Sequence, residues 1–391
     1  MILHKNTIKS LMIASTLILA IGCSKDDDPP APKLVEEPTP SSPAYSIPAT
    51  YSFVDGSGAS TVNFNGQQQR LEMLSEMTVY MKTGNTVGTT LSATQLKDMY
   101  ANNAYTWTDS PGYGMTGSSK QLKSKTAAGD VGVQAMFEAY IDSIAYVSTF
   151  SVTNSSETYG QNGVWTNGTK SYLISGNGIE YTQLIEKGLM CTVFMNQMTV
   201  NYLGSVGSDD NTTLVSGKNY TEMQHSWDEA YGYFTSEYDY PTNGTDRFWG
   251  KYANDLEVLL GSATVIATAF RTGRSAIENA DYTTRDAQIT IIRNEMEKVC
   301  AGTAIHYLNE AKANITDPTV KNHVLSEAWA FIEGLRYGYN SINGVSITST
   351  EVDTALAYIG TDFSSVTIGN INLAIDLIAS KTGLDSVKAS L

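Results

Sequence analysis

The chain has 391 residues, a formal net charge of −15 at pH 7 and three cysteines. Such an acidic surface repels nucleic acid and anionic lipid headgroups, so both are excluded as electrostatic partners. Cys191 and Cys300 lie in apolar helical patterns. They therefore either form one disulfide in an oxidising compartment or stay reduced and buried.

Residues 1–22 have the pattern of an export signal. Lys5 and Lys9 precede a short apolar run that ends at Ile21, and Gly22 and Cys23 follow it. The run is too short to span a bilayer. A cysteine directly after small residues predicts a lipoprotein signal, in which Cys23 is lipidated and becomes the first residue of the mature chain.

Residues 23–48 are predicted to be a disordered tether, because they are rich in Pro, Asp, Glu and Ser and almost lack aromatic side chains. The acidic run over residues 24–28 is similar to the signal that carries some Gram-negative lipoproteins to the outer face. The predicted location is therefore the outer membrane, at the cell surface and held by the lipid. A merely soluble linker is the alternative interpretation of the run.

Helical periodicity dominates the remaining sequence. Apolar residues recur at helical spacing over residues 66–81, 131–150, 179–203, 220–234, 246–260, 262–279, 284–314, 317–339, 350–359 and 372–380. Residues 152–173 read as a long loop or a small hairpin, and residues 204–218 as a loop. The predicted class is all-α with little or no β-structure, built as two packed helical bundles over residues 49–218 and 219–391.

The stretch ISGNGIEYTQLIEKGL, residues 174–189, resembles the signature helix of the imelysin-like proteins, Gly-x-His-x-x-Glu followed by an aromatic residue. Glu180 and Tyr181 match the end of that pattern. Asn177 stands where the family has its histidine, and Ser175 where it has its glycine. The resemblance implies an imelysin-like helical fold. The family has been classed with peptidases, but the metal-ligand type is lost here.

Further strings are similar to an uncharacterised family of exported lipoproteins, a domain of unknown function. That family is associated with imelysin-like proteins and with TonB-dependent outer-membrane receptors. The resemblance implies surface capture or uptake of a nutrient, with iron as the leading candidate, and it makes an outer-membrane receptor or an imelysin-like protein the expected partner. The strings are STVNFNGQQQRLEMLSEM (60–77), YTEMQHSWDEAYGYF (220–234), FWGKY (248–252), GRSAI (273–277) and HVLSEAWAFI (323–332).

Glu180 begins a helical stripe that contains Gln183 and Lys187 and continues into apolar residues. The stripe predicts a carboxylate that is buried or lines a cleft rather than a solvated one. A buried acid must be paired, hydrogen-bonded or protonated, which makes Glu180 and Gln183 candidates for ligand binding. The alternative is a core glutamate neutralised by Lys187 or by an arginine of another helix.

The helix around His225 presents His225, Asp228 and Glu229 on one face and aromatic residues on the other. Histidine with acids three and four residues later is able to hold a divalent metal or iron, the candidate cofactor. A polar face opposite an aromatic one is also what an ordinary surface helix shows, and both interpretations stay open.

Glu327 lies in an apolar helix one turn after His323, so it is expected to be buried and bonded to that histidine. Arg271 and Arg274 are expected counter-ions for buried acids, and Arg274 is a predicted ligand-binding residue with Glu327. His306 is expected to be a satisfied core histidine. The resulting hypothesis is that four side chains converge on one cleft with Arg274 balancing their charge: Glu180, His225, Glu229 and Glu327.

The sequence has no zinc-peptidase motif, no nucleophile elbow, no phosphate loop and no dinucleotide fingerprint. No residue is therefore predicted to be catalytic. The expected function is a lipid-anchored binding protein of the cell envelope that serves nutrient uptake, with iron or another metal as a candidate ligand. The alternatives are an imelysin-like metal-dependent peptidase and a structural partner of a TonB-dependent outer-membrane receptor.

Overall fold

The computed structural model describes residues 44–109, 112–151, 157–242 and 246–391. Residues 45–391 form one compact unit. The predicted export signal, Cys23 and nearly all of the predicted tether lie outside the described residues. Among the helices that are described, none is both long enough and apolar enough to cross a membrane.

The first part of the unit is helical. Its elements are α1 (Asn65–Thr83), α2 (Ala93–Ala101), η1 (Lys123–Gly129) and α3 (Val131–Ser148). The N-terminus of α3 is capped by Asp130, whose carboxylate accepts from two backbone N–H groups. The apolar periodicity does not predict helix α2, because this helix is short and follows a stretch of Gly, Asn and Thr.

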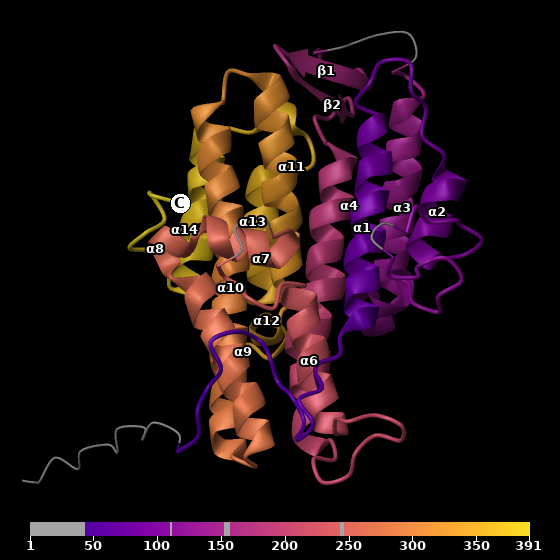
Figure 1. The fold of residues 1–391 in the computed structure, drawn as a ribbon. Coiled ribbons are helices and arrows are strands. Elements are labelled where there is room, and N and C mark those ends of the chain that lie inside the picture. The colour runs from indigo at the N-terminus through magenta and orange to yellow at the C-terminus, as the bar shows by residue number, and fades with distance from the viewer. Residues whose placement is uncertain (1–43, 110–111, 152–156, 243–245) are drawn as a thin grey trace, which may run out of the picture. The chain divides into compact units, whose positions relative to one another are not determined.

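A two-stranded hairpin precedes the central helix. Strands β1 (Gly163–Asn167) and β2 (Lys170–Ile174) pair antiparallel, with Trp165 opposite Tyr172. Next come α4 (Tyr181–Leu189), the π-helical segments η2 (Met190–Met195) and η3 (Gln197–Tyr202), α5 (Leu203–Ser205) and η4 (Val206–Ser208). These segments follow one another without a loop, and Figure 1 shows the hairpin at one end of α4.

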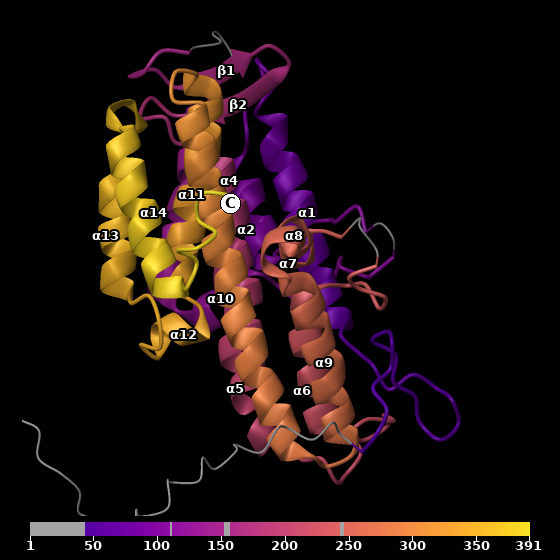
Figure 2. The same cartoon turned by 90° about the vertical axis from the view of Figure 1, so that its left-hand side faces the viewer.

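The remaining elements complete the helical unit. They are α6 (Glu222–Phe234), α7 (Phe248–Asp255), α8 (Glu257–Leu260), α9 (Ser262–Glu278), α10 (Tyr282–Ala313), α11 (Pro318–Leu335), α12 (Tyr339–Ile342), α13 (Ser349–Ile359), η5 (Phe363–Ser365) and α14 (Ile368–Thr382). Helix α10 has 32 residues and is about 48 Å long. Figure 2 shows α13 and α14 side by side next to α10 and α11.

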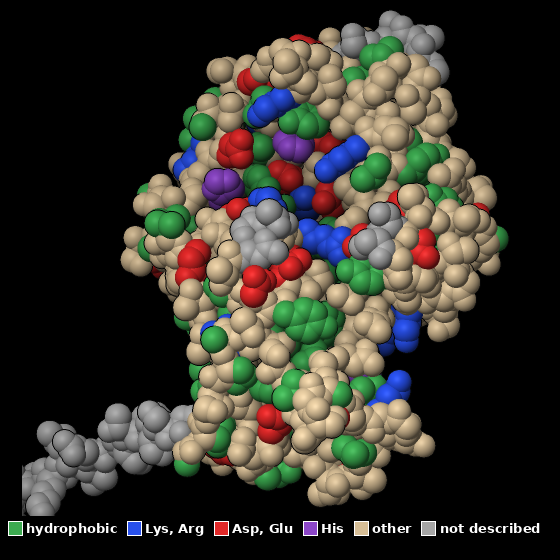
Figure 3. All heavy atoms as spheres, viewed as in Figure 1, with side chains coloured by type: hydrophobic (Ala, Val, Ile, Leu, Met, Phe, Trp, Pro, Cys, Tyr) green, Lys and Arg blue, Asp and Glu red, His purple; other side chains and the backbone are tan. Residues whose placement is uncertain are grey.

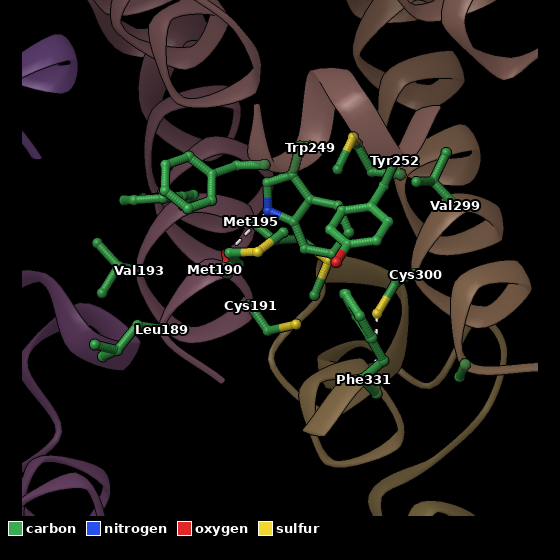
Figure 4. Packing of buried hydrophobic residues seen from close by; sticks show 14 of the residues in the cluster. Leu189, Met190, Cys191, Val193, Met195, Trp249, Tyr252, Val299, Cys300 and Phe331 are labelled. Carbon is green, nitrogen blue, oxygen red and sulfur yellow. Dashed lines mark hydrogen bonds between the residues drawn. The ribbon is translucent and has the colours of Figure 1, made fainter. Parts of the chain in front are cut away.

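One part of the hydrophobic core lies where α4 and η2 meet α7, α10 and α11. Trp249 donates its indole N–H to the carbonyl of Met190 at 2.9 Å (Figure 4), and its ring lies edge-to-face with that of Phe331, with centroids 5.9 Å apart. Cys191 and Cys300 are free and fully buried there. Of the two states that the sequence left open, the structure has the reduced, buried one, and burial raises the pKa of the Cys300 thiol.

The all-α class is confirmed, with one small hairpin over residues 163–174, where a loop or small hairpin was predicted. Helix α11 is capped by Asp317, whose carboxylate accepts from the N–H of Val320 at 3.1 Å, and Pro318 begins the helix. The predicted helix 246–260 is divided at Leu256 into α7 and α8, and the predicted helix 317–339 ends at Leu335.

Helices from both sides of the predicted boundary at residues 218 and 219 pack within the single compact unit: α1 and α4 before it contact α6 and α11 after it. Gly273 of α9 lies against the Trp227 side chain of α6, and a Cβ atom at this position would overlap the Trp227 ring.

Candidate functional site

Glu180 is fully buried at the N-terminus of α4, next to the hairpin. Its backbone N–H donates to Ser326 Oγ of α11 at 2.9 Å, and its Oε1 accepts from the side-chain amide of Gln183 at 3.1 Å. Its Oε2 lies 2.6 Å from Nδ1 of His323. Glu180 therefore bonds Gln183 within its own helix, and its ionic partner is a histidine rather than a lysine or an arginine.

His323 joins Glu180 to Glu327. It lies on α11, its ring stacks on Tyr172 of β2 with centroids 3.9 Å apart, and its Nε2 is 3.7 Å from Glu327 Oε2. Burial alone lowers the pKa of His323, but the carboxylates of Glu180 and Glu327 outweigh burial, and the net pKa is raised. Burial also raises the pKa of Glu327, against the lowering effects of Lys187 and His323.

Lys187, on α4, is the next charged residue in contact with Glu327. Its Nζ lies 3.5 Å from Glu327 Oε1 and 3.1 Å from Glu186 Oε2, and 5.6 Å from the centroid of the Tyr252 ring. Burial lowers the pKa of Lys187, but the two carboxylates outweigh it, so the net pKa lies above its usual range and the ammonium is retained. We call these five residues the acid–base chain: Glu180, His323, Glu327, Lys187 and Glu186.

Two hollows open beside the acid–base chain, and they share Lys251 and Tyr252. The first, of about 400 Å³, lies between α1, α4 and α7, and we call it the α7 hollow. The second, of about 360 Å³, lies between α7 and α10, and we call it the α10 hollow. Figure 3 shows histidine, acidic and basic side chains gathered in a depression between the regions of α11 and α4.

The α7 hollow is lined by four basic residues, two acids, two hydroxyls and three apolar side chains: Lys82, Lys187, Arg247, Lys251, Glu186, Asp246, Ser75, Thr78, Val79, Phe248 and Tyr252. The α10 hollow is lined by Lys251, Tyr252, Asp255, Leu256, Thr303, His306, Tyr307 and Glu310. Buried charge beside open space of this size is typical of small-ligand sites.

Arg274 does not neutralise the charge of the acid–base chain, which corrects the sequence-based hypothesis. Its Nε donates to Asp228 Oδ1 at 3.0 Å, and its terminal nitrogens donate to Glu278 and Thr61, each at 3.0 Å. Both Arg274 and Asp228 are fully buried. Arg271 is not paired with an acid of the acid–base chain either. It donates to the carbonyl of Tyr240 at 3.4 Å.

The metal site predicted from His225, Asp228 and Glu229 does not form. Asp228 faces the core, because it lies three residues before Tyr231 at the edge of the aromatic stripe of α6, and Tyr51 Oη donates to it at 2.7 Å. His225 Nε2 is 3.9 Å from Glu229 Oε2. In the part of the chain that the structure describes, no three His, Cys, Asp or Glu side chains are placed to hold a metal ion.

His225 and Glu229 are also far from Glu180. Gln67 donates to Glu229 Oε1 at 3.0 Å and lies 3.4 Å from Tyr202 Oη. Tyr202 follows Glu180 by about 20 residues of uninterrupted helix, which places the two acids roughly 30 Å apart. The predicted single cleft is therefore wrong: Glu180 and Glu327 share one site, and His225 and Glu229 lie elsewhere, on α6 (Figure 1).

One further expectation is corrected. His306 is exposed at the α10 hollow and is not a core histidine. Asn177, at the position of the family histidine, is exposed and lines a separate hollow of about 230 Å³ with Tyr140, Ile179, Tyr181, Leu184, Trp329, Thr361 and Phe363. No pattern in the sequence points to the α7 hollow, because its residues come from three helices far apart in the chain.

The raised pKa of His323 predicts a pH-dependent contribution to stability. A histidine that binds its proton more tightly in the folded state stabilises the fold below about pH 6.5 and loses that contribution as pH rises through its folded pKa. The wild type should therefore be more stable than His323→Gln below about pH 6.5, and this difference in unfolding free energy should decrease as pH rises above that value. Urea unfolding of both proteins at several pH values measures this difference.

Glu180→Gln provides the matched test, because Glu180 is the carboxylate that raises the pKa of His323 most. In that background, the loss of stability caused by His323→Gln should lose most of its pH dependence. A loss that stays constant with pH in the wild-type background, or one that grows as pH rises, would contradict the proposed protonation of His323.

The fold and the site define an all-α protein with a charged cleft beside its central helix. A family model matches residues 48–383, and the chain belongs to that family, which is described as a domain of unknown function (DUF4856). No curated protein and no solved structure matches the chain.

Proposed function

We propose that the protein is a lipid-anchored binding protein of the cell envelope, which holds a small polar ligand in the α7 and α10 hollows and serves nutrient uptake. The observation that carries the proposal is the position of the acid–base chain. Its charges are buried in the helical unit, yet Lys187 and Glu186 also line an open hollow of about 400 Å³. Volumes of about 300 to 1,000 Å³ are usual for small-molecule sites.

Iron or another metal is the proposed nutrient, from the resemblance to lipoproteins associated with imelysin-like proteins and TonB-dependent receptors. The carboxylates of the acid–base chain already engage His323 and Lys187. We therefore propose that a metal enters within an organic chelate rather than as a bare ion. An outer-membrane receptor or an imelysin-like protein is the proposed recipient.

The anchor is tested by Cys23→Ala. Without the lipidated cysteine, the mature chain should move from the membrane fraction to the soluble fraction, because the short apolar leader cannot anchor it alone. Ser24→Ala, next to the lipidation position, is the control and should stay in the membrane. Fractionation with a radiolabelled fatty acid measures both, and membrane retention of Cys23→Ala without label would contradict the anchor.

A binding protein should return its ligand unchanged. Purified protein is therefore expected to leave casein and insulin chains intact, with or without added zinc. Chelator-sensitive cleavage that Glu180→Gln abolishes would favour the imelysin-like peptidase instead.

A further inference from the structure

We infer that the α7 hollow binds the anionic group of a small molecule, a carboxylate or a phosphate, through its lysines and arginine and the hydroxyl of Thr78. This inference rests on the proposed function and names the class of ligand. The rest of the ligand would extend past Tyr252 toward the α10 hollow, since the two hollows share that side chain.

The first observation is the local charge. Four basic side chains and two acids line the hollow, in a chain whose formal net charge is −15. One of the acids, Glu186, serves two lysines: its Oε2 is 3.1 Å from Lys187 Nζ and 3.9 Å from Lys82 Nζ. The side chain of Lys82 is half exposed, and its ammonium lies 3.9 Å from its only acidic partner among the described residues. An anion in the hollow would therefore bind this ammonium without breaking a strong ion pair.

The other two basic residues are placed on the same hollow by α7. Arg247 donates to Glu72 at 2.8 Å and to Ser75 Oγ at 3.3 Å. Lys251 pairs with Asp255 at the surface, where ion pairs contribute little and exchange partners readily. The second acid, Asp246, is buried, and burial raises its pKa to about 6, so it becomes neutral at a higher pH than an ordinary aspartate.

The second observation is independent of charge. Thr78 lines the hollow on α1 with 5% of its surface exposed, and its Oγ1 has no hydrogen-bond partner in the described part of the chain. A buried hydroxyl without a partner is costly and needs an explanation. The Oγ1 atom itself is shielded, so Thr78 must rotate its side chain toward the hollow for an oxyanion to supply the missing acceptor. Charge-assisted hydrogen bonds of this kind are among the stronger ones.

The third observation concerns the apolar part of the lining. Val79, Phe248 and Tyr252 supply one aliphatic and two aromatic side chains. They would contact the carbon framework of an organic anion, while the basic residues and Thr78 hold its charged end. Small-ligand sites commonly combine an apolar lining with a few placed polar groups in this way.

The test is titration calorimetry of the mature chain with citrate, inorganic phosphate and the neutral polyol glycerol, at constant ionic strength. We expect saturable binding of citrate or phosphate and none of glycerol, and the two anions distinguish a carboxylate from a phosphate site. Lys82→Met should weaken that binding. Lys97→Met removes a comparably exposed lysine, which pairs with Asp142 on another surface, and should leave it unchanged.

Thr78→Val gives the sharpest outcome, because its effects on binding and on stability have opposite signs. It should weaken anion binding roughly tenfold, as expected for a lost hydrogen bond to a charged group, while the free protein unfolds at equal or higher urea concentration. Thr182→Val is the matched control: Thr182 is also buried with an unpartnered Oγ1 but does not line the hollow, so only stability should change.

Failure of both anions to bind, or binding that neither Thr78→Val nor Lys82→Met weakens, would overturn the anion assignment. The anion assignment would also be wrong if the wild type retained a neutral or cationic molecule and Lys187→Met did not. The proposed binding function would then still stand. The proposed function itself is wrong if the wild type retains no small molecule. It is also wrong if substitutions of the lining residues do not change what the protein retains.

Discussion

Asp228→Asn should lower the free energy of unfolding by about 3–5 kcal/mol, the usual cost of breaking a buried ion pair from one side. Asp228 is fully buried and accepts from Arg274 Nε at 3.0 Å and Tyr51 Oη at 2.7 Å. The neutral amide would leave the equally buried Arg274 with less compensation. It would also loosen the segment that carries Tyr51, whose ring stacks on Tyr231 at a centroid distance of 3.6 Å.

Equilibrium urea unfolding measures this change. Asp255→Asn is the control, because Asp255 pairs with Lys251 in the same helix with both side chains about half exposed. That substitution should cost no more than about 1 kcal/mol. Equal costs for Asp228→Asn and Asp255→Asn would show that the Asp228–Arg274 pair does not hold the N-terminal segment against α6 and α9.

Lys187→Met should lower the free energy of unfolding by about 3 kcal/mol or more, because it leaves two buried acids without their ammonium partner. Lys187 and Glu327 each expose only 8% of their side chains, and Glu186 exposes 11%. Each acid would then have to take up a proton or remain charged in a poorly solvated place. The loss should be smallest at acidic pH, because burial raises the pKa of Glu327 and this acid is then protonated most easily.

The double variant Lys187→Met with Glu327→Gln checks the cause. Removing the uncompensated carboxylate should restore part of the stability, so the two single losses should not add. Lys97→Met, which removes an exposed lysine 2.7 Å from Asp142, is the matched control and should cost about 1 kcal/mol at most. Strictly additive losses from Lys187→Met and Glu327→Gln would mean that these two side chains do not interact.

The helical class and most helix positions follow from the sequence, because the apolar residues recur at a spacing that only a helix places on one face. The same reasoning predicts that Glu180 and Glu327 are buried, since each lies in an apolar stripe, and both are. It also predicts contact between Glu327 and His323, because residues four apart on a helix are neighbours.

Which helices lie side by side could not be predicted in this way. His323 bonds Glu180 across 143 residues of sequence, and Arg274 bonds Asp228 rather than the acids of α4 and α11. Periodicity assigns a residue to a face, but it does not say which other helix covers that face. The hypothesis of one shared cleft failed for this reason, and the lining of the α7 hollow could not be found.

Retention of a small molecule by the mature chain tests the charged cleft most directly. Wild type, Thr78→Val, Lys82→Met and Lys97→Met are each incubated with a small-molecule extract of spent growth medium, separated from unbound material by gel filtration, and analysed by native mass spectrometry. Wild type and Lys97→Met should retain the same anionic species, and Thr78→Val and Lys82→Met should retain less of it. The same retention by all four proteins, or none by the wild type, would contradict a ligand site in the α7 hollow.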